Sequence, residues 1–376
     1  KHNEVVEKLL TLNQSVIPNS KKLPKVVVVK PAMKKGLGNR FPGIVCGFLY
    51  SIITNRLLFI DGYNHFEDYF EKDFEHNWEK VANLYNNRSF KSLHNVEENE
   101  FSLITRGNLS SEEVNSYDIL HVHTWDYVCV PIMSNPYYKE WINEIIPEYK
   151  VFTIISQKLF RLKSDVNKQI DTFINNNFGE YNIGIHLRLK KNIRKTIGMI
   201  IPIENYCRVV EMLLIGIGKR NVTVFIAADM NESRDTLINY IHKSLNSNKE
   251  FVKIVHVNNN MSIKNPSNRN PGTEISALID MKILSFCDDL VLTFGSTFGY
   301  VAAGWSYRSL RRLRSPFVVM PMRNTTDDFA VDKIWLWRAE SNEPCMYLSK
   351  ELMKNADPET VKVFKTNPFW MHYSQG

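Results

Sequence analysis

Apolar segments of strand length and of helix length alternate at the start of the chain. The β-branched run 25–30 (KVVVVK) predicts a short strand, and the apolar stretch 41–54 has the length and periodicity of a helix. The segment 56–61 (RLLFID) predicts a second strand. Because a strand, a helix and a strand follow one another, this segment is expected to form a β-α-β unit with parallel strands.

The same alternation is more regular in the second half of the chain. Strands are predicted at 182–188, 222–228, 252–257, 289–294 and 316–320. Helices are predicted at 203–217, 232–246 and 273–287, and a short helix opens at Ser296. Strands that alternate with helices indicate a parallel sheet that is covered on both faces.

The region between these two halves is less regular. Between 67 and 148 the pattern predicts one strand, at 119–123 (ILHVH), and a charged helical stretch then runs from 157 to 176. It ends in the polar run Asn175–Asn177, which marks a domain boundary.

We therefore predict an N-terminal domain 1–178 and a C-terminal domain 179–322, with a tail, 323–376, that packs back on the first domain. Two Rossmann-like domains that face each other across a cleft would form the α/β architecture called GT-B.

Composition supports two folded domains and excludes one class of partner. The chain has 376 residues, 44% of them apolar, which is enough for two separate cores. Its net charge of +7 is concentrated in the runs 188–195 (RLKKNIRK) and 308–314 (RSLRRLR). No groove-reading motif or aromatic platform accompanies them, so nucleic-acid binding is not expected. The runs form either a solvated surface or a local field that attracts phosphate.

Cysteine spacing and hydropathy limit the remaining classes. No apolar stretch reaches the roughly 18 residues that a membrane-spanning helix needs, and a targeting or anchoring segment before Lys1 has either been removed or never existed. The cysteines form no C-x-x-C motif, which argues against zinc or thioredoxin-like chemistry, and at most two disulfides can form. The five cysteines are Cys46, Cys129, Cys207, Cys287 and Cys345.

The segment GSTFGY follows an apolar strand directly and opens a helix. The N-terminus of a helix presents backbone N–H donors and a partial positive charge, which together stabilise a bound phosphate. The predicted anion site therefore comprises Ser296, Thr297, Phe298, Gly299 and Tyr300. An ordinary helix N-cap is the alternative interpretation.

Two further positions in this domain carry polar chemistry. In the strand GIHLR, His186 and Arg188 share one face, and Arg188 stands at the carboxyl end, where a guanidinium can bind a pyrophosphate bidentately. Arg188 could instead begin the exposed basic run. Asp280 lies in the predicted helix 273–287, where it either accepts hydrogen bonds from a base or ribose or is solvated.

Missing motifs exclude other nucleotide enzymes. No D-x-D sequence occurs, which favours a site that needs no metal ion. The loop GLGNRF lacks the third glycine of G-x-G-x-x-G, and no P-loop motif is present, so dehydrogenases and P-loop enzymes are disfavoured.

Two long segments resemble a known family. KKGLGNRFPGIVCGFLYSIITNRLLFIDGYNHFEDYF is similar to the first motif region of the plant xyloglucan α-1,2-fucosyltransferases, and ISALIDMKILSFCDDLVLTFGSTFGYVAAG is similar to a segment near the C-terminal end of those enzymes. GIHLR resembles a strand shared by α-1,2-, α-1,6- and protein O-fucosyltransferases.

This resemblance implies an inverting GT-B enzyme that moves fucose from GDP-fucose to a glycan acceptor, with no metal ion and no further cofactor. Arg188 would contact the GDP pyrophosphate, His186 would lie beside it, and Asp280 and the turn 296–300 would help to bind the nucleotide. The opposing wall would comprise Gly36, Gly38, Asn39 and Arg40. A Golgi lumenal enzyme with a type II membrane anchor outside this sequence is implied, and homodimerisation is left open.

The acceptor and the catalytic base are not fixed by these motifs. After GYVAAG the chain reads WSYRSLRRLRSPF, which departs from the family pattern. Asp61 ends one predicted strand, and His123 and Asp126 stand at and after the end of another. These three residues are candidates for the base, although structural roles are the alternative for each. A protein O-fucosyltransferase and an inactive glycan-binding protein remain the competing hypotheses.

Overall fold

The computed structural model describes most of the chain as two units. The described residues are 23–33, 35–63, 65–72, 75–94, 98–123, 129–146, 150–189, 201–218, 220–244, 251–257, 271–306, 315–320, 336–339, 342–344, 358–359 and 362. Unit 1 contains Lys1–Lys163 and Glu343–Gly376, and unit 2 contains Ser164–Asn342.

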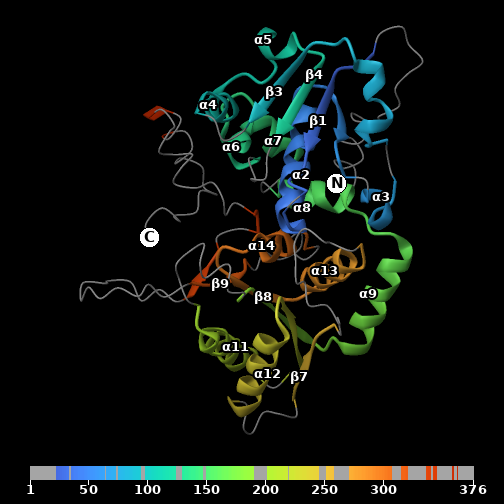
Figure 1. The fold of residues 1–376 in the computed structure, drawn as a ribbon. Helices are drawn as coiled ribbons and strands as arrows, with labels where there is room; N and C mark the ends of the chain where they lie inside the picture. Colours follow the sequence, from blue (N-terminus) through green and yellow to red (C-terminus); the bar gives the residue numbers. More distant parts are fainter. Residues whose placement is uncertain are drawn as a thin grey trace. The chain divides into compact units, whose positions relative to one another are not determined.

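Unit 1 is built on a four-stranded parallel sheet with the order β2-β1-β4-β3 (Figure 1). The strands are β1 (Val26–Lys30), β2 (Leu57–Ile60), β3 (Phe90–His94) and β4 (Ile119–His123). Strand β1 is fully buried from Val26 to Val29, which fits a central strand that is covered on both faces. The predicted β-α-β unit is therefore present, with α2 between β1 and β2.

Helices and short turns surround this sheet. Helix α2 begins at Leu37, before the predicted segment 41–54, so Pro42 lies inside the helix. The helices of unit 1 are α2 (Leu37–Ile53), α3 (Phe66–Tyr69), α4 (Glu98–Arg106), α5 (Glu112–Asn115), α6 (Cys129–Ser134), α7 (Lys139–Ile145) and α8 (Val151–Leu159), with 3-10 turns at Trp78–Lys80 and Ala82–Tyr85.

Unit 2 contains a six-stranded sheet with the order β10-β9-β8-β5-β6-β7. Its strands are β5 (Tyr181–Leu187), β6 (Val222–Ala228), β7 (Val252–Val255), β8 (Asp289–Thr293), β9 (Phe317–Val319) and β10 (Leu336–Arg338). All pairs are parallel except β10 with β9. The chain leaves β5 toward β6 and β7 and later returns to the other side of β5 as β8, so a topological switch point lies between β5 and β8.

Two pairs of helices cover the two faces of this sheet. Helices α11 (Ile203–Ile217) and α12 (Asn231–Ser244) pack on the face to which β5 contributes Ile183 and Ile185. Helices α13 (Pro271–Leu284) and α14 (Thr297–Gly304) lie on the opposite face and appear together above the sheet in Figure 1. The sequence therefore predicted the regular α/β character of this unit correctly.

The boundary between the units differs from the predicted one. The helical stretch 157–176 is two helices, α8 and α9 (Ser164–Asn177), and unit 2 begins with α9. Helix α9 packs on α13, and Phe173 of α9 lies edge-on to Phe225 of β6 with ring centroids 5.7 Å apart. Unit 2 also extends to Asn342, past the predicted end at 322, because β10 pairs with β9.

A described part of the C-terminal tail contacts unit 1. Both carboxylate oxygens of Glu343 accept from the backbone N–H of Phe152, at 3.1 and 3.2 Å, and Glu343 is buried. Phe152 is in the first turn of α8, where N–H groups lack partners within the helix. Glu343 therefore joins the tail to the start of α8.

Candidate functional site

The candidate site lies at the carboxyl ends of β5 and β8, at the switch point of unit 2. In the register of the two strands Ile185 lies beside Val291, so Leu187 and Thr293 are neighbours at this edge. Arg188 follows β5, and the turn Phe294–Ser296 follows β8 and leads into α14. In open α/β sheets this is the place where ligands bind.

The backbone of Arg188 is held by a buried hydroxyl network. Its N–H donates to Oγ1 of Thr293 over 2.9 Å, and that hydroxyl donates to the carbonyl oxygen of His186 over 2.8 Å. The hydroxyl of Tyr206, on α11, lies 2.7 Å from the same Oγ1. Thr293 thereby joins β5, β8 and α11 at one atom.

The side chain of Arg188 has an acidic neighbour that the sequence analysis did not identify. Its Nη1 lies 3.3 Å from Oδ2 of Asp229, while Oδ1 of Asp229 accepts from the N–H of Leu189 over 3.1 Å. The Arg188 side chain is 40% exposed and that of Asp229 is 8% exposed. A fixed carboxylate therefore orients a guanidinium that still reaches solvent, where it can bind an anion.

The turn before α14 has the geometry of a strand-to-helix anion loop. Gly295 has φ of +77°, in the left-handed region that glycine adopts without strain. Ser296 is the N-cap residue and its side chain makes no capping hydrogen bond, so it does not form the ordinary side-chain cap that was the alternative interpretation. The dipole of the eight-residue helix α14 gives this end a partial positive charge.

The His186 side chain packs against the residues that follow this turn. Its ring stacks on Phe298 with centroids 5.0 Å apart, and a Cβ at Gly299 would come within 3.0 Å of its Nδ1. Burial, together with the charge of Arg188, lowers the pKa of His186 to about 3. The imidazole is therefore neutral near pH 7 and shapes the turn without adding charge.

The other predicted residues of the turn differ in their exposure. Thr297 and Phe298 are half-buried, whereas Ser296, Gly299 and Tyr300 are buried. Tyr300 is 3% exposed and belongs to the core. The accessible part of the predicted anion site is thus the beginning of α14.

Asp280 is half-buried on α13, and its Oδ1 is shielded from solvent. Burial raises the pKa of Asp280 to about 7, and the charge of Arg234 opposes that rise. A carboxyl group that titrates near neutrality can donate or accept a hydrogen bond. Its predicted contact with the nucleotide stays a prediction.

In unit 1 the predicted wall residues lie at the carboxyl end of β1. Gly36 and Asn39 are half-buried, and Gly38 and Arg40 are buried in α2. Nε and Nη2 of Arg40 donate to the carbonyl oxygens of Lys35 and Met33, over 3.2 and 3.0 Å, and its guanidinium lies 5.2 Å from the Tyr63 ring centroid. Arg40 therefore holds this loop in shape.

Two of the three base candidates lie at the carboxyl end of the unit 1 sheet. Asp61 follows β2, and its Oδ2 lies 3.6 Å from Nζ of Lys30, the last residue of β1. His123 ends β4 and is in register with Lys30. Asp126 lies outside the described residues. Asp61 and His123 therefore flank Lys30 at one edge of the sheet.

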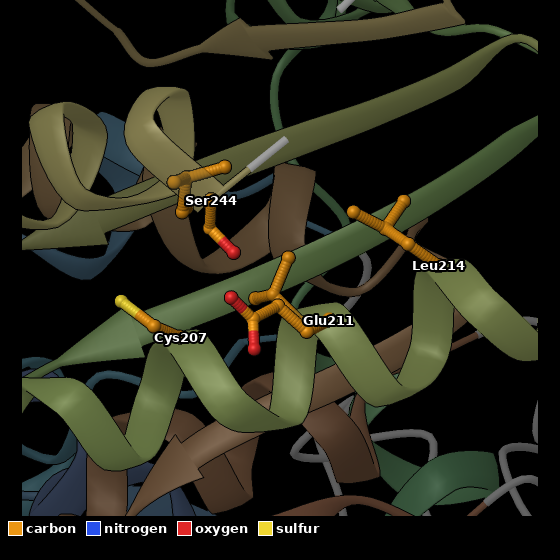
Figure 2. Close-up of a pocket in the computed structure, with 6 residues that line it drawn as sticks. Cys207, Glu211, Leu214 and Ser244 are labelled. Atoms are coloured by element: carbon orange, nitrogen blue, oxygen red, sulfur yellow. The ribbon is translucent and has the colours of Figure 1, made fainter. Parts of the chain in front are cut away.

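A second feature of unit 2 is a small pocket between α11 and α12 (Figure 2). It is lined by Cys207, Val210, Glu211, Leu214, Ile241 and Ser244. It contains none of the predicted site residues and carries a single charged side chain, Glu211.

Within the residues that the structure describes, no group of three His, Cys, Asp or Glu side chains could hold a metal ion. Among those residues, too, no helix has the length and hydropathy to span a bilayer.

Comparison with known proteins adds two findings. The family model described as xyloglucan fucosyltransferase matches residues 9–132. A search of curated proteins finds no significant match.

Solved structures match over most of the chain. A variant of Arabidopsis thaliana FUT1 in complex with GDP has a TM-score of 0.61 and 21% identity, covering 91% of this chain and 79% of that one. The fucosyltransferase NodZ from Bradyrhizobium has a TM-score of 0.52 and 15% identity over 79% of this chain and 95% of its own. NodZ α-1,6-fucosyltransferase soaked with GDP-fucose has a TM-score of 0.50 and 15% identity, covering 78% and 94%.

At these identities the solved structures establish the fold. The predicted α/β fold of the GT-B type, with two Rossmann-like units, is confirmed, while the facing of the units across a cleft stays a prediction. The resemblance of this chain to the xyloglucan fucosyltransferase family is confirmed by the family model over residues 9–132.

Proposed function

We propose that this protein is a fucosyltransferase that uses GDP-fucose as its donor. The observation that carries the proposal is that Arg188, at the carboxyl end of β5, donates its backbone N–H to Thr293, at the carboxyl end of β8 and three residues before the N-cap of α14, at the switch point of unit 2. A guanidinium and a helix N-terminus at one edge offer two sources of positive charge to a pyrophosphate. The family match and the fold of GDP-bound fucosyltransferases support fucose as the sugar.

We further propose that the transfer inverts the configuration at fucose C1 and forms an α-1,2 linkage to a galactoside. In such a transfer an acceptor hydroxyl attacks C1 from the face opposite GDP, the C1–O bond to the β-phosphate breaks, and GDP leaves with its charge stabilised. Arg188 and the start of α14 are the groups that would stabilise GDP. The hydroxyl proton passes to a base or to water, and Asp61, His123 and Asp126 are the candidates.

The proposal includes a donor site that works without a metal ion. The charge of Arg188 and the dipole of α14 replace the divalent cation that other enzymes use to neutralise a pyrophosphate. Transfer should therefore persist in excess EDTA, and an activity that EDTA abolishes and Mg²⁺ or Mn²⁺ restores would refute this part. A Golgi lumenal location belongs to the same proposal and rests on the family resemblance.

A donor and acceptor assay separates this function from its competitors. The protein is incubated with GDP-fucose alone, with a panel of galactoside-terminated glycans, and with folded protein acceptors that carry Ser or Thr sites, and released GDP is measured. Release that depends on a galactoside is expected. Release with protein acceptors alone would indicate a protein O-fucosyltransferase, and no release under any condition would favour a glycan-binding protein.

The linkage and stereochemistry require the product itself. NMR of the purified glycan reports the configuration at fucose C1 and the substituted hydroxyl. An α-fucoside on the 2-hydroxyl of galactose is expected. Another linkage would overturn the acceptor assignment and leave the donor assignment standing.

A further inference from the structure

Two cysteines from distant parts of the sequence meet in the core of unit 1. Sγ of Cys46, in α2, lies 2.7 Å from Sγ of Cys129, the first residue of α6. Both side chains are completely buried. Helices α2 and α6 pack against each other, so the approach belongs to a helix contact within the unit.

This separation of the two Sγ atoms is too short for an ordinary non-bonded contact between two thiols. A distance of 2.7 Å is typical of two hydrogen-bonded oxygen atoms, and sulfur is the larger atom. The thiol is also only a weak hydrogen-bond donor, so a strong hydrogen bond does not account for the approach. The two sulfur atoms point at each other and stand within a small movement of a sulfur–sulfur bond, which measures about 2.05 Å.

We propose that Cys46 and Cys129 are a disulfide-forming pair. The oxidant is a disulfide, either an oxidised dithiol protein or a small-molecule disulfide. The thiolate of one cysteine attacks a sulfur of that disulfide and releases one thiol, and the second thiolate then attacks the mixed disulfide and releases the other. The cysteines lose two electrons and two protons, and the oxidant is reduced to two thiols.

The burial of the pair determines when this exchange takes place. Because neither sulfur is exposed in the folded unit, the oxidant must reach them before α6 has packed on α2. The bond closes the chain between 46 and 129 and restricts the unfolded state of unit 1. Once formed, it is shielded from reductants by the same packing.

The remaining cysteines provide the internal control. Cys207 and Cys287 are buried in unit 2, and Cys345 lies outside the described residues. Cys207 belongs to the core on one face of the unit 2 sheet, whereas Sγ of Cys287 faces Gly184 on the other face, so the folded unit does not bring these two cysteines together. The proposal therefore concerns Cys46 and Cys129 alone.

Thiol counting on the full chain tests the proposal. The protein is unfolded, reduced and refolded in a buffer of reduced and oxidised glutathione, then denatured without reductant and alkylated. Of the five cysteines, three should be modified, and trypsin should release peptides 41–56 and 107–139 as a linked pair that reductant separates. Five modified cysteines, or a link that joins any other pair, would overturn the proposal.

Two single variants show which cysteines form the bond. The number of alkylated cysteines in each variant does not depend on how stable that variant is. Cys46→Ala leaves four cysteines, and all four should be alkylated because Cys129 has lost its partner. Cys207→Ala also leaves four, but only two should be alkylated. Equal counts in the two variants would contradict the assignment.

For the oxidised wild type, dithiothreitol should break the bond much faster in denaturant than in native buffer, and equal rates would contradict the shielding.

Discussion

The carboxylate of Asp229 lies 3.3 Å from the guanidinium of Arg188 and also accepts a hydrogen bond from the backbone N–H of Leu189. These contacts fix the direction of the guanidinium that follows β5 in the candidate site. Leu187 and Ala228 are in register on β5 and β6, so Arg188 and Asp229 follow equivalent positions of neighbouring strands. The register of the neighbouring strands β5 and β6 therefore brings Arg188 and Asp229 together.

The Asp229→Asn variant should separate orientation from binding. The amide oxygen can still accept from Leu189, but the charge that orients Arg188 is lost, so we expect kcat to fall about tenfold. GDP affinity should not weaken, because a negative charge has been removed near a negatively charged ligand. Steady-state kinetics and GDP calorimetry measure the two effects. Asp235→Asn, at an exposed carboxylate, is the matched control and should change neither.

Thr293→Val should destabilise unit 2 although the two side chains have the same shape. The change leaves the N–H of Arg188 and the hydroxyl of Tyr206 without the oxygen that they contact. Losing a buried partner of this kind costs about 1–3 kcal/mol. Urea unfolding measures this loss, and Thr293→Ser, which keeps the hydroxyl, should lose less. Equal stability of the valine variant and the wild type would show that the network is dispensable.

Asp280 should make stability depend on pH. Its pKa is raised from 3.8 to about 7 in the folded state, so between these values the folded form holds a proton that the unfolded form releases. Stability therefore declines as pH rises from about 4 to about 7 and is level above that. The Asp280→Asn side chain cannot ionise, so the variant does not lose this stability as pH rises. The free energy of unfolding of the variant minus that of wild type should therefore be about 1–3 kcal/mol larger at pH 8 than at pH 5. Unfolding at the two pH values measures this, and an unchanged difference would contradict the shifted pKa.

The contact between Glu343 and the start of α8 should contribute to the stability of unit 1. Glu343→Gln keeps an acceptor for the N–H of Phe152 but removes the charge that favours a helix N-terminus, and we expect a loss of about 0.5–2 kcal/mol. Glu359→Gln is the control, because Glu359 is 73% exposed and its pair with Arg106 should contribute little. Thermal unfolding compares the two. A larger effect at Glu359 would argue against a specific role for Glu343.

The sequence predicted the elements of unit 2 well because strand and helix periods alternate there without interruption. The helix 203–217 and the strand 222–228 have the predicted bounds. In unit 1 the strand Phe90–His94 was not predicted, because FKSLH lies at the edge of the sheet and lacks a clear apolar alternation. Strand β10 was not predicted either, because it is only three residues long and lies in the irregular tail.

The residues around Arg188 show why part of the site could not be predicted. Asp229 could have been found, since an acid follows β6 where a base follows β5, and consecutive parallel strands place such residues together. The hydroxyl of Tyr206 reaches Thr293 across 87 residues of sequence, and no local pattern marks that contact. Contacts of this kind depend on how α11 packs on the sheet.

The most direct test of the account is the rate of acceptor-dependent GDP release by wild type and Arg188→Ala. Circular dichroism establishes that the variant is folded, and Arg220→Ala, at an exposed arginine of unit 2, is the matched control. We expect Arg188→Ala to lose at least about a hundredfold in rate, because a charge that stabilises the leaving group is removed. Arg220→Ala should keep the wild-type rate. Near-normal turnover by folded Arg188→Ala would contradict the central claim that this residue and the start of α14 hold the pyrophosphate.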